Sequence, residues 1–511
     1  MTNPRQTHPR SARPGAEARR TRTTRIYDNH EVLYSVLVME KNGVLLDTRA
    51  CAATLAQATA DEAKSLATLR NWARTDGWFG DDCPDEVVDE LWTSSTVGLP
   101  AFLHGEAGLG LEPSPIFAKG RLRDGEISTD HAAIDYLASH NPKHRKNLNG
   151  IIRLRQERST IKYATKWPTF VLEDGLIHPI FGASRDDGGD GGTVSGRLGI
   201  KKPEFAQAPI DEDKDHYKLR KWVVAPPGHK VVTVDAQAGE VVVLADYLIW
   251  RLGDDRLASR LADPVDIHSK TTAALFPELR LTGADVAWGK ELEAWPADRA
   301  LPGRLPTHVW TGPWTHATIP SALNTARNKR AKTTRYSLHY GKGKWGMGHT
   351  MVTPEGDPIG EDVAGDLIDR FMADEPWLDD YMDEIWWRLS RFGGVTALDG
   401  NALDMRSLWA EGRWRRWSAW RKALNFPMQR GLAYIINLWM FLVATNPKIK
   451  AMGGVLRLQI HDELGLTAPE ENAEDVKEEV RADLRRACAK AGLLVPLQSS
   501  GGVGDTWYDA H

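Results

Sequence analysis

The strongest constraint on the fold is a pair of aspartates, each placed at the end of an apolar strand pattern. Residues 231–234 (VVTV) are a run typical of a buried strand, and Asp235 follows it directly. Near the C-terminus, two alternating runs flank residues 461–463 (HDE), which predicts a hairpin with Asp462 at its tip. Most aspartates at strand ends form turns, but such a carboxylate also suits Mg²⁺, which prefers oxygen ligands. Brought together, the two aspartates could hold two Mg²⁺ ions for an in-line displacement.

The composition bounds the kinds of protein that this chain can be. Of its 511 residues, 41% are hydrophobic, which is enough for about two to four domains or subdomains. The 65 basic and 69 acidic residues give a net charge of −4. This balance excludes a disordered chain and a strongly basic DNA-coating protein, so a nucleic-acid surface has to be a local patch.

Cysteine usage and hydropathy indicate a cytoplasmic protein. The cysteines Cys51, Cys83 and Cys488 are far apart and outside any CxxC pattern, which argues against disulfides and a zinc site. The most hydrophobic stretch, residues 431–445, is too short to span a membrane and predicts a buried helix. We therefore expect a reducing cytoplasmic setting without a signal peptide or a membrane partner.

Helical patterns alternate with loop-like segments along the chain. Residues 1–25 hold seven arginines and predict a disordered tail, which is either a solvated segment or a flexible arm for DNA. Residues 186–192 predict a flexible loop, and residues 277–325 predict a loop with six prolines and four tryptophans. These tryptophans form a small core or meet a partner protein or single-stranded DNA. Helices are expected at 52–72, 144–162, 240–250, 329–341 and 425–444.

Two of the expected helices carry side chains that suit phosphates. Lys332, Tyr336 and Tyr340 are spaced i, i+4, i+8, so one face could hold a triphosphate and stack on a base. The alternative is a helix packed by its tyrosines. In the segment 144–162, a basic stripe of Arg155, Arg158 and Lys162 suits a phosphate backbone or is only a solvated face.

A third face lies near the C-terminus, where Arg421, Asn425 and Gln429 have the same spacing around Pro427. Amide and guanidinium groups on one face can contact the acceptors that all base pairs present in a minor groove. A solvated polar face is the alternative, and a proline inside the helix can change which side chains share a face.

Together, these segments resemble the motifs of the family-A DNA polymerases, the bacterial DNA polymerase I family and its bacteriophage relatives. The resemblance covers roughly residues 30–511, and the common order of the motifs is more specific than any one of them. The matching segments are SGRL at 195–198, FAQAP at 205–209, VDAQAGE at 234–240, DIHSKT at 266–271, KRAKTTRYSLHYG at 329–341, LDG at 398–400, RKALNFPMQ at 421–429, LQIHDEL at 458–464 and the terminal GVGDTWYDAH.

The resemblance implies an α+β fold with a right-hand polymerase architecture, in which an antiparallel sheet forms the palm. It also implies that this chain carries no 3′→5′ exonuclease and no 5′-nuclease, because a nuclease domain needs on the order of 150 residues. The expected divisions are a disordered basic tail (1–28), the palm (29–55, 178–241 and 416–511), the thumb (56–177) and the fingers (242–415), with an insertion near 277–325.

The resemblance further implies roles for single residues. The catalytic residues would be Asp235, Asp462 and Lys332, and the metal ligands would be the two aspartates with the backbone carbonyl of Ala236. Glu463 would support the metal site. At the nucleotide we expect Glu240, which would select deoxyribose, with His268, Lys329, Lys332, Tyr336 and Tyr340. At the primer–template we expect Arg197, Gln207, Arg421, Asn425, Gln429 and His461.

The chain departs from the family pattern just before Lys332. The position four residues earlier, which is usually an arginine, is Asn328. Lys329 lies on nearly the same face of an α-helix as Lys332 and is the expected replacement, whereas Arg327 is a weaker candidate by helical angle.

The implied reaction is the template-directed addition of dNMPs to a primer 3′-hydroxyl, with two Mg²⁺ ions and release of pyrophosphate. Primer–template DNA and dNTPs are the expected partners, with a separate exonuclease or processivity factor. A polymerase module with an unusual insertion suggests a bacteriophage enzyme that works in the host cytoplasm. Two alternatives remain. Glu240 argues against an enzyme like the single-subunit RNA polymerases, and the retained Asp235, Lys332 and Asp462 argue against an inactive primer–template binding protein.

Overall fold

The computed structural model describes residues 27–93, 98–113, 127–182, 195–208 and 216–511. The tail before residue 27 and the loop expected at 186–192 lie outside these ranges. The chain forms two compact units, each assembled from separate stretches of sequence. The first comprises 1–54, 162–263 and 377–511, and the second comprises 55–161 and 264–376.

The first unit contains all the strands of the described residues. Its strands are β1 (Val44–Leu46), β2 (Leu176–Ile177), β3 (Ile180–Gly182), β4 (Gly199–Lys201), β5 (Val223–Val224), β6 (His229–Ala236), β7 (Gly394–Thr396), β8 (Ala402–Asp404), β9 (Val455–Ile460), β10 (Glu463–Pro469) and β11 (Ser499–Gly504). Its α-helices are α1 (Tyr27–Asn42), α7 (Gly239–Leu252), α8 (Arg256–Ala262), α15 (Trp377–Phe392), α16 (Arg406–Ala410), α17 (Arg413–Thr445), α18 (Pro447–Ala451) and α19 (Ala473–Ala491).

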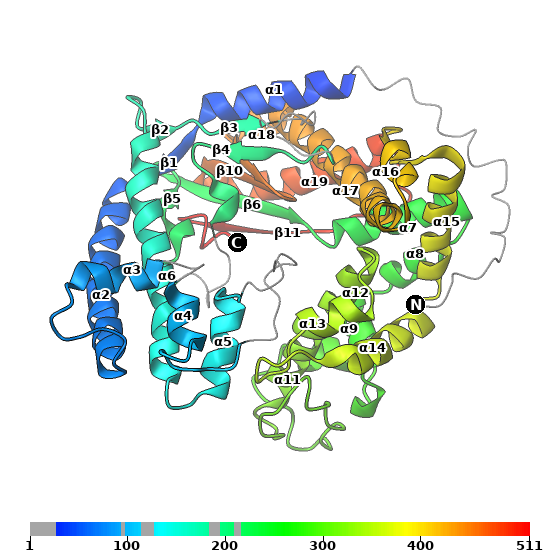
Figure 1. Ribbon diagram of the computed structural model, residues 1–511. Coiled ribbons are helices and arrows are strands. Elements are labelled where there is room, and N and C mark those ends of the chain that lie inside the picture. The colour runs from blue at the N-terminus through cyan, green and yellow to red at the C-terminus, as the bar shows by residue number, and fades with distance from the viewer. Residues whose placement is uncertain (1–26, 94–97, 114–126, 183–194, 209–215) are drawn as a thin grey trace. The chain divides into compact units, whose positions relative to one another are not determined.

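A four-stranded antiparallel sheet is the centre of this unit, as Figure 1 shows. The strand order is β11-β6-β10-β9, so β6 lies between the C-terminal strand and the β9–β10 hairpin. Val231, Val232 and Val234 of β6 are buried, because β-branched side chains pack well on a covered sheet. The predicted strand and hairpin are therefore confirmed, and so is the α+β class with an antiparallel sheet. The subdomain boundaries stay a prediction.

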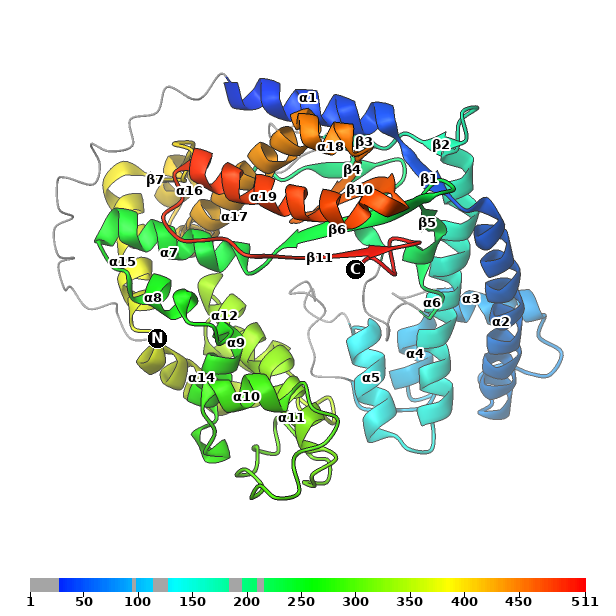
Figure 2. The same cartoon turned by 180° about the vertical axis from the view of Figure 1, so that it is seen from behind.

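Helices cover this sheet. α19 packs along β6 and β11, α17 packs on α19 and α7, and α1 lies beside α17 and β9 (Figure 2). The indole of Trp439 in α17 is fully buried, and its Nε1–H donates to the carbonyl of Val480 in α19 at 2.8 Å. This bond satisfies the one polar atom of a side chain that contributes a large apolar area to the core.

α17 is longer than the sequence pattern predicted. It begins at Arg413 rather than near Asn425 and continues through Pro427 to Thr445. Alanine, arginine and lysine favour helix over the first turns, and proline here does not end the helix although it lacks an N–H. The apolar stretch 431–445 is buried in this helix as expected. In the described ranges, no helix is both long and apolar enough to cross a membrane.

The prediction that residues 277–325 form a loop is wrong at both ends. α10 (Gly283–Gly289) and α11 (Ile319–Thr325) lie within the segment. A capping box starts α10: the Thr282 hydroxyl accepts from Asp285 N–H, and the Asp285 carboxylate accepts from Thr282 N–H. Trp295 is buried, packs edge-on against Trp288 and donates to a carbonyl, which supports the small-core interpretation.

The second unit is helical in its described residues. It comprises α2 (Thr48–Thr75, whose first residues belong to the first unit), α3 (Asp85–Thr93), α4 (Gly98–His104), α5 (His131–His140), most of α6 (Arg145–Lys166), α9 (Ile267–Leu275), α10, α11, a π-helix (Ala326–Ala331), α12 (Lys332–His339), α13 (Lys344–Thr350) and α14 (Gly360–Asp374). Trp72, Trp92 and Phe102 contact one another in the core of its N-terminal half.

Two arginines of the basic stripe on α6 make contacts within the fold, whereas Lys162 is exposed. The guanidinium of Arg155 donates to the carbonyl of Thr129 at 2.5 Å, and burial lowers its pKa. Arg158 donates to Glu62 at 2.8 Å. These two arginines therefore stabilise contacts within their own unit.

A fully buried ion pair holds α12 in place. Arg335 and Glu375 are both inaccessible to solvent, and one bond between them measures 2.7 Å. Nη2 of Arg335 donates both to Glu375 and to the hydroxyl of Thr271 in α9. Removing one partner would leave a buried charge without its counterion, which costs about 3–5 kcal/mol.

We therefore predict that Glu375→Gln lowers the free energy of unfolding by about 3 kcal/mol or more, measured by urea denaturation. Lys64→Gln is the control, because Lys64 is 75% exposed and its pair with Asp61 is solvated, so its removal should change stability little. Equal losses in the two variants would contradict the role given to the buried pair.

Candidate active site

The antiparallel register of β6 and β10 brings the two sequence-predicted aspartates to one end of the sheet. Glu463 lies directly across from Asp235, and the N–H of Ala236 donates to the carbonyl of Asp462 at 3.1 Å. Residues from the middle and the end of the sequence are thereby fixed beside each other by backbone hydrogen bonds. Asp235, Ala236 and Asp462, the three predicted metal ligands, lie at one end of the same sheet.

The tip of the hairpin is held in an unusual conformation. His461 has a φ of 55°, in the left-handed region that glycine favours in two-residue turns. The amide of Gln459 donates to the His461 carbonyl, and the imidazole is exposed. A non-glycine residue in this region costs of order 1–3 kcal/mol, and such strain is typical of functional sites.

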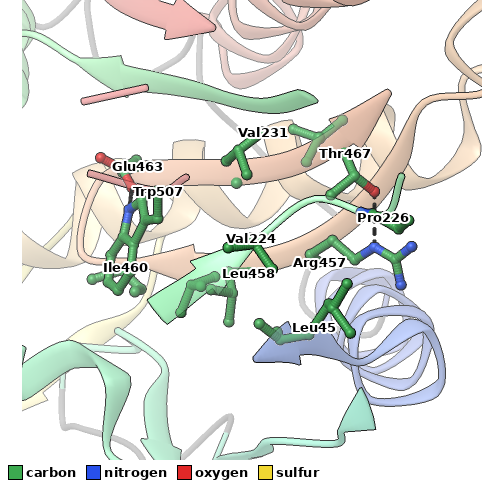
Figure 3. Close-up of a pocket in the computed structure, with 14 residues that line it drawn as sticks. Leu45, Val224, Pro226, Val231, Arg457, Leu458, Ile460, Glu463, Thr467 and Trp507 are labelled. Carbon is green, nitrogen blue, oxygen red and sulfur yellow. Dashed lines mark hydrogen bonds between the residues drawn. The ribbon is translucent and has the colours of Figure 1, made fainter. Parts of the chain in front are cut away.

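The C-terminal residues hold the acid beside Asp462. Glu463 is buried and accepts hydrogen bonds from Trp507 Nε1 at 2.8 Å and from His511 Nδ1 at 2.7 Å. Figure 3 shows Glu463 and Trp507 together at one end of an apolar pocket lined by β9, β10, β5 and β1. The bond to Glu463 raises the pKa of His511, although burial acts in the opposite direction. The fixed Glu463 keeps the start of β10, and hence Asp462, in position.

The donor set at this sheet end fits Mg²⁺. Burial raises the pKa of Asp462, and nearby Glu240 adds to the shift, while Arg197 and His461 oppose it. A bound cation would offset this unfavourable burial of negative charge. Mg²⁺ keeps several waters and is usually held by one or two carboxylates plus substrate phosphates, so Asp235, Asp462 and one backbone carbonyl suffice.

Arg197 and Glu240 form an ion pair next to these aspartates. The guanidinium of Arg197 donates to the Glu240 carboxylate, which is only 10% exposed. Gly196 has a φ of 77°, and a Cβ there would lie 1.9 Å from Nη1 of Arg430 in α17. Glycine is therefore required for the backbone turn that aims Arg197 at Glu240.

The α17 face predicted to contact DNA is present, but its members differ in exposure. Arg421 is exposed, and Asn425 and Gln429 are half-buried. The side-chain amide of Asn425 donates to the carbonyl of Arg421 at 2.8 Å, one turn earlier. Gln207 is exposed at the end of a short 3₁₀ turn (Phe205–Gln207). These side chains can therefore donate to a ligand without disturbing the core.

In the second unit, Asp266 organises the residues predicted to bind the triphosphate. Its carboxylate caps α9 by accepting from the N–H groups of His268 and Ser269 at 3.1 and 3.0 Å. It also accepts from Arg327 at 2.8 Å. Burial alone would raise the pKa of Asp266, but the bonds from Ser269 and Arg327 outweigh it and lower the pKa.

His268 is held neutral. Burial lowers its pKa to about 3, and the charges of Arg335, Arg327 and Lys332 add to the effect. Its ring lies 6.0 Å from that of Tyr336, between centroids. A neutral imidazole can donate only one N–H, so His268 would position a phosphate without adding charge.

A π-helix changes which cation shares a face with Lys332. Residues 326–331 form i→i+5 turns, which take about one residue more than α-helical turns. Arg327, five residues before Lys332, therefore returns toward the side of Lys332, and both charges act on His268. Lys329 is exposed. Single-residue insertions of this kind could not be inferred from an α-helical wheel, so the sequence pattern favoured Lys329.

The remaining predicted nucleotide contacts lie on α12. Lys332 is exposed, whereas Tyr336 and Tyr340 are half-buried with ring centroids 6.4 Å apart. Tyr340 follows the last helical residue, and Gly341 has a φ of 68° that ends the helix. The helix predicted over 329–341 is thus present as α12 from Lys332 to His339, whereas residues 329–331 belong to the π-helix.

The low pKa of His268 makes stability depend on pH. Below the ordinary histidine pKa of 6.5, the unfolded chain takes up a proton that folded His268 does not, so stability falls as pH falls. For this group alone, the loss between pH 7.5 and 5.0 is about 2 kcal/mol. We predict that His268→Gln flattens the pH dependence of urea unfolding. An equally steep loss in the variant would contradict a neutral, buried His268.

Comparisons with known proteins agree with this geometry. The family model "DNA polymerase family A" matches residues 89–281 and 309–509. A thermostable DNA polymerase I of Thermus thermophilus is 26% identical over 391 residues, which are 76% of this chain and 39% of that protein. DNA polymerase I of Pseudomonas aeruginosa is 25% identical over 84% of this chain and 39% of its own length. The chain thus spans well under half the length of such relatives.

A solved structure has the same fold. The polymerase (POL) domain of Pol1 from M. smegmatis, in complex with primer–template DNA and dNTP, superimposes with a TM-score of 0.69 over 94% of this chain and 70% of that chain, at 20% identity. The family model covers most of the sequence, including the sheet end with Asp235 and Asp462 and the helix with Lys332. The chain therefore belongs to DNA polymerase family A.

Proposed function

We propose that this chain is a DNA-directed DNA polymerase that adds dNMPs from dNTPs to the 3′-hydroxyl of a primer paired with a template. The observation that carries the proposal is the backbone pairing of β6 with β10, which sets Asp235 and Asp462 at one sheet end beside the Arg197–Glu240 pair. Membership in the family supports it. Phosphoryl transfer needs positioning and charge neutralisation more than covalent chemistry, and these residues supply both.

Each group of residues has a distinct task in this reaction. Two Mg²⁺ ions, when bound, would activate the primer hydroxyl and stabilise the leaving pyrophosphate. Asp235, Asp462 and the Ala236 carbonyl would hold them. Lys332 and Arg327 would bind the negative triphosphate, and neutral His268 would donate one hydrogen bond to it. Primer and template would lie along the exposed polar groups of α17 and at Arg197, Gln207 and His461.

We predict that Asp462→Ala abolishes primer extension with dNTPs and Mg²⁺ while retaining most of the affinity for primer–template DNA. The reason is that this carboxylate is assigned to a metal and not to a phosphate. Asp505→Ala is the matched control, because Asp505 is an exposed carboxylate that pairs with Lys230. Extension by Asp462→Ala at the wild-type rate would refute the assignment of this carboxylate to a metal ion. Extension by the wild-type protein only with rNTPs would favour an enzyme like the single-subunit RNA polymerases.

Arg327 and not Lys329 should bind the triphosphate. We predict that Arg327→Ala raises the KM for dNTPs about ten- to hundredfold, because one charge-assisted contact is lost. Lys329→Ala should change KM less than about twofold. Steady-state kinetics with one dNTP measures both, and Arg327→Lys tests charge alone. A larger effect at Lys329 would restore the assignment made from α-helical spacing.

Glu240 should select the sugar. Its carboxylate is held by Arg197. In the proposed reaction, this fixed side chain would exclude a ribose 2′-hydroxyl. We predict that Glu240→Ala increases rNTP incorporation relative to dNTP at least tenfold, measured by single-nucleotide extension. Arg197→Gln should relax selection less, because the carboxylate remains. An unchanged dNTP/rNTP ratio in Glu240→Ala would refute this role.

The absence of proofreading by this chain stays a prediction. A labelled primer with a mismatched 3′ end should keep its length when incubated with Mg²⁺ and without nucleotides.

A further inference from the structure

The first turns of α17 expose a tryptophan that has no part in the catalytic site. The side chain of Trp414 is 85% exposed, whereas Trp417 and Trp420 on the same helix are half-buried and buried. Tryptophan carries a large apolar area, and leaving it in water gains nothing for the fold. An indole exposed to this degree points to a ligand.

Trp414 shares a helix face with the groups assigned to DNA. Arg421 and Asn425 follow it by seven and eleven residues, which in an α-helix are nearly whole numbers of turns. Trp414 thus lies about 10 Å from Arg421 along the helix axis, measured at 1.5 Å per residue. Trp414 thus extends the polar face of α17 toward the start of the helix. Arg430, which lies against Gly196 next to Arg197, is further along the helix.

An aromatic cluster makes the start of this helix rigid. The ring of Trp386 in α15 lies 4.9 Å from Trp409 and 5.5 Å from Trp417, between centroids. Trp417 contacts Trp420 edge-on at 5.2 Å. Arg416 donates to the Trp409 carbonyl at 3.0 Å, which ties α16 to α17. Trp414 is therefore presented on a fixed support, so little entropy is lost when it binds a ligand.

The charges around Trp414 favour a polyanion. Residues 406–422 hold six basic residues and one acidic residue. Arg415 is 63% exposed and lies 3.4 Å from the exposed carboxylate of Glu411, a solvated pair that a phosphate could replace. Arg421 is exposed on the same face as Trp414. A surface for a protein partner would not need this excess of positive charge.

We propose that Trp414 stacks on a base of the unpaired template strand, while Arg415 and Arg421 contact its phosphates. An indole stacks most readily on an unpaired base, because a duplex hides all of its base faces except those of the terminal pairs. In the proposed reaction, the template ahead of the primer end is the strand that is unpaired. The inference rests on the proposed function and adds to it a site for single-stranded DNA outside the catalytic centre.

The test compares two substitutions of similar bulk. Trp414→Phe keeps an aromatic face, and Trp414→Leu keeps only apolar area. Fluorescence anisotropy would measure affinity for a primer–template with a template overhang of about 15 nucleotides and for the same duplex with blunt ends. We expect Trp414→Leu to bind the overhang substrate about five- to tenfold more weakly, Trp414→Phe to lose less, and blunt-end affinity to stay the same.

A control variant and a second substrate separate base stacking from a general loss of DNA affinity. Trp288→Leu, at another exposed tryptophan, should leave the preference for the overhang unchanged. Equal losses on blunt and overhang substrates would overturn the proposal, as would equal behaviour of the Phe and Leu variants. The second substrate is a fork in which the displaced strand, and not the template, is single-stranded. A loss of affinity seen only on this fork would also overturn the proposal.

The outcome is distinguishable from failure of the proposed function. Asp462→Ala should retain the full preference for the overhang although it extends no primer. If wild-type protein failed to extend any primer but lost overhang affinity on Trp414→Leu, the single-strand site would stand without the polymerase reaction. Loss of single-nucleotide extension by Trp414→Leu on a one-nucleotide overhang would instead place Trp414 in the catalytic site and overturn the proposal.

Discussion

The pairing of β6 with β10 is the interaction on which the candidate active site depends. Backbone hydrogen bonds between these strands fix Asp235 across from Glu463 and bond Ala236 to Asp462. Because a shift of one residue would send every side chain to the other face of the sheet, the buried valines of β6 also fix the register of the acids. The hydrophobic core and the position of the carboxylates are thus set by the same contacts.

Holding several acids together has an electrostatic cost that the surrounding residues reduce. Burial raises the pKa of Asp462, and Glu240 adds to it. Arg197 pairs with Glu240, while Trp507 and His511 hydrogen-bond Glu463. The contacts of Trp507 and His511 with Glu463 also explain why the last residues of the chain fold back onto the sheet. The strained His461 at the hairpin tip fits the same pattern of stability given up at a functional site.

Much of the fold was predictable because its signals are local. The strand before Asp235, the hairpin around Asp462 and the helix from Lys332 all follow from short periodic patterns. The resemblance to a family then gave roles to residues whose own patterns were weak, such as Arg197 and Gln429. The subdomain boundaries and the roles of single residues remain predictions.

What the sequence could not predict depends on tertiary contacts. Arg155 and Arg158 look like a basic stripe, but their partners Thr129 and Glu62 lie far away in the sequence. The π-helix brings Arg327 to the same side of the helix as Lys332. No periodic pattern in the sequence marks such an insertion. The exposure of Trp414 depends on how α15 and α16 pack against α17, so four nearby tryptophans look alike until the fold is known.

The most direct test of this account is a structure of the protein with a dideoxy-terminated primer, its template, the next dNTP and Mg²⁺. The account predicts two Mg²⁺ ions about 2.0–2.1 Å from oxygens of Asp235 and Asp462, with the triphosphate on Lys332 and Arg327. Metal ions held by other residues, or DNA bound away from the sheet end that carries these aspartates, would contradict it.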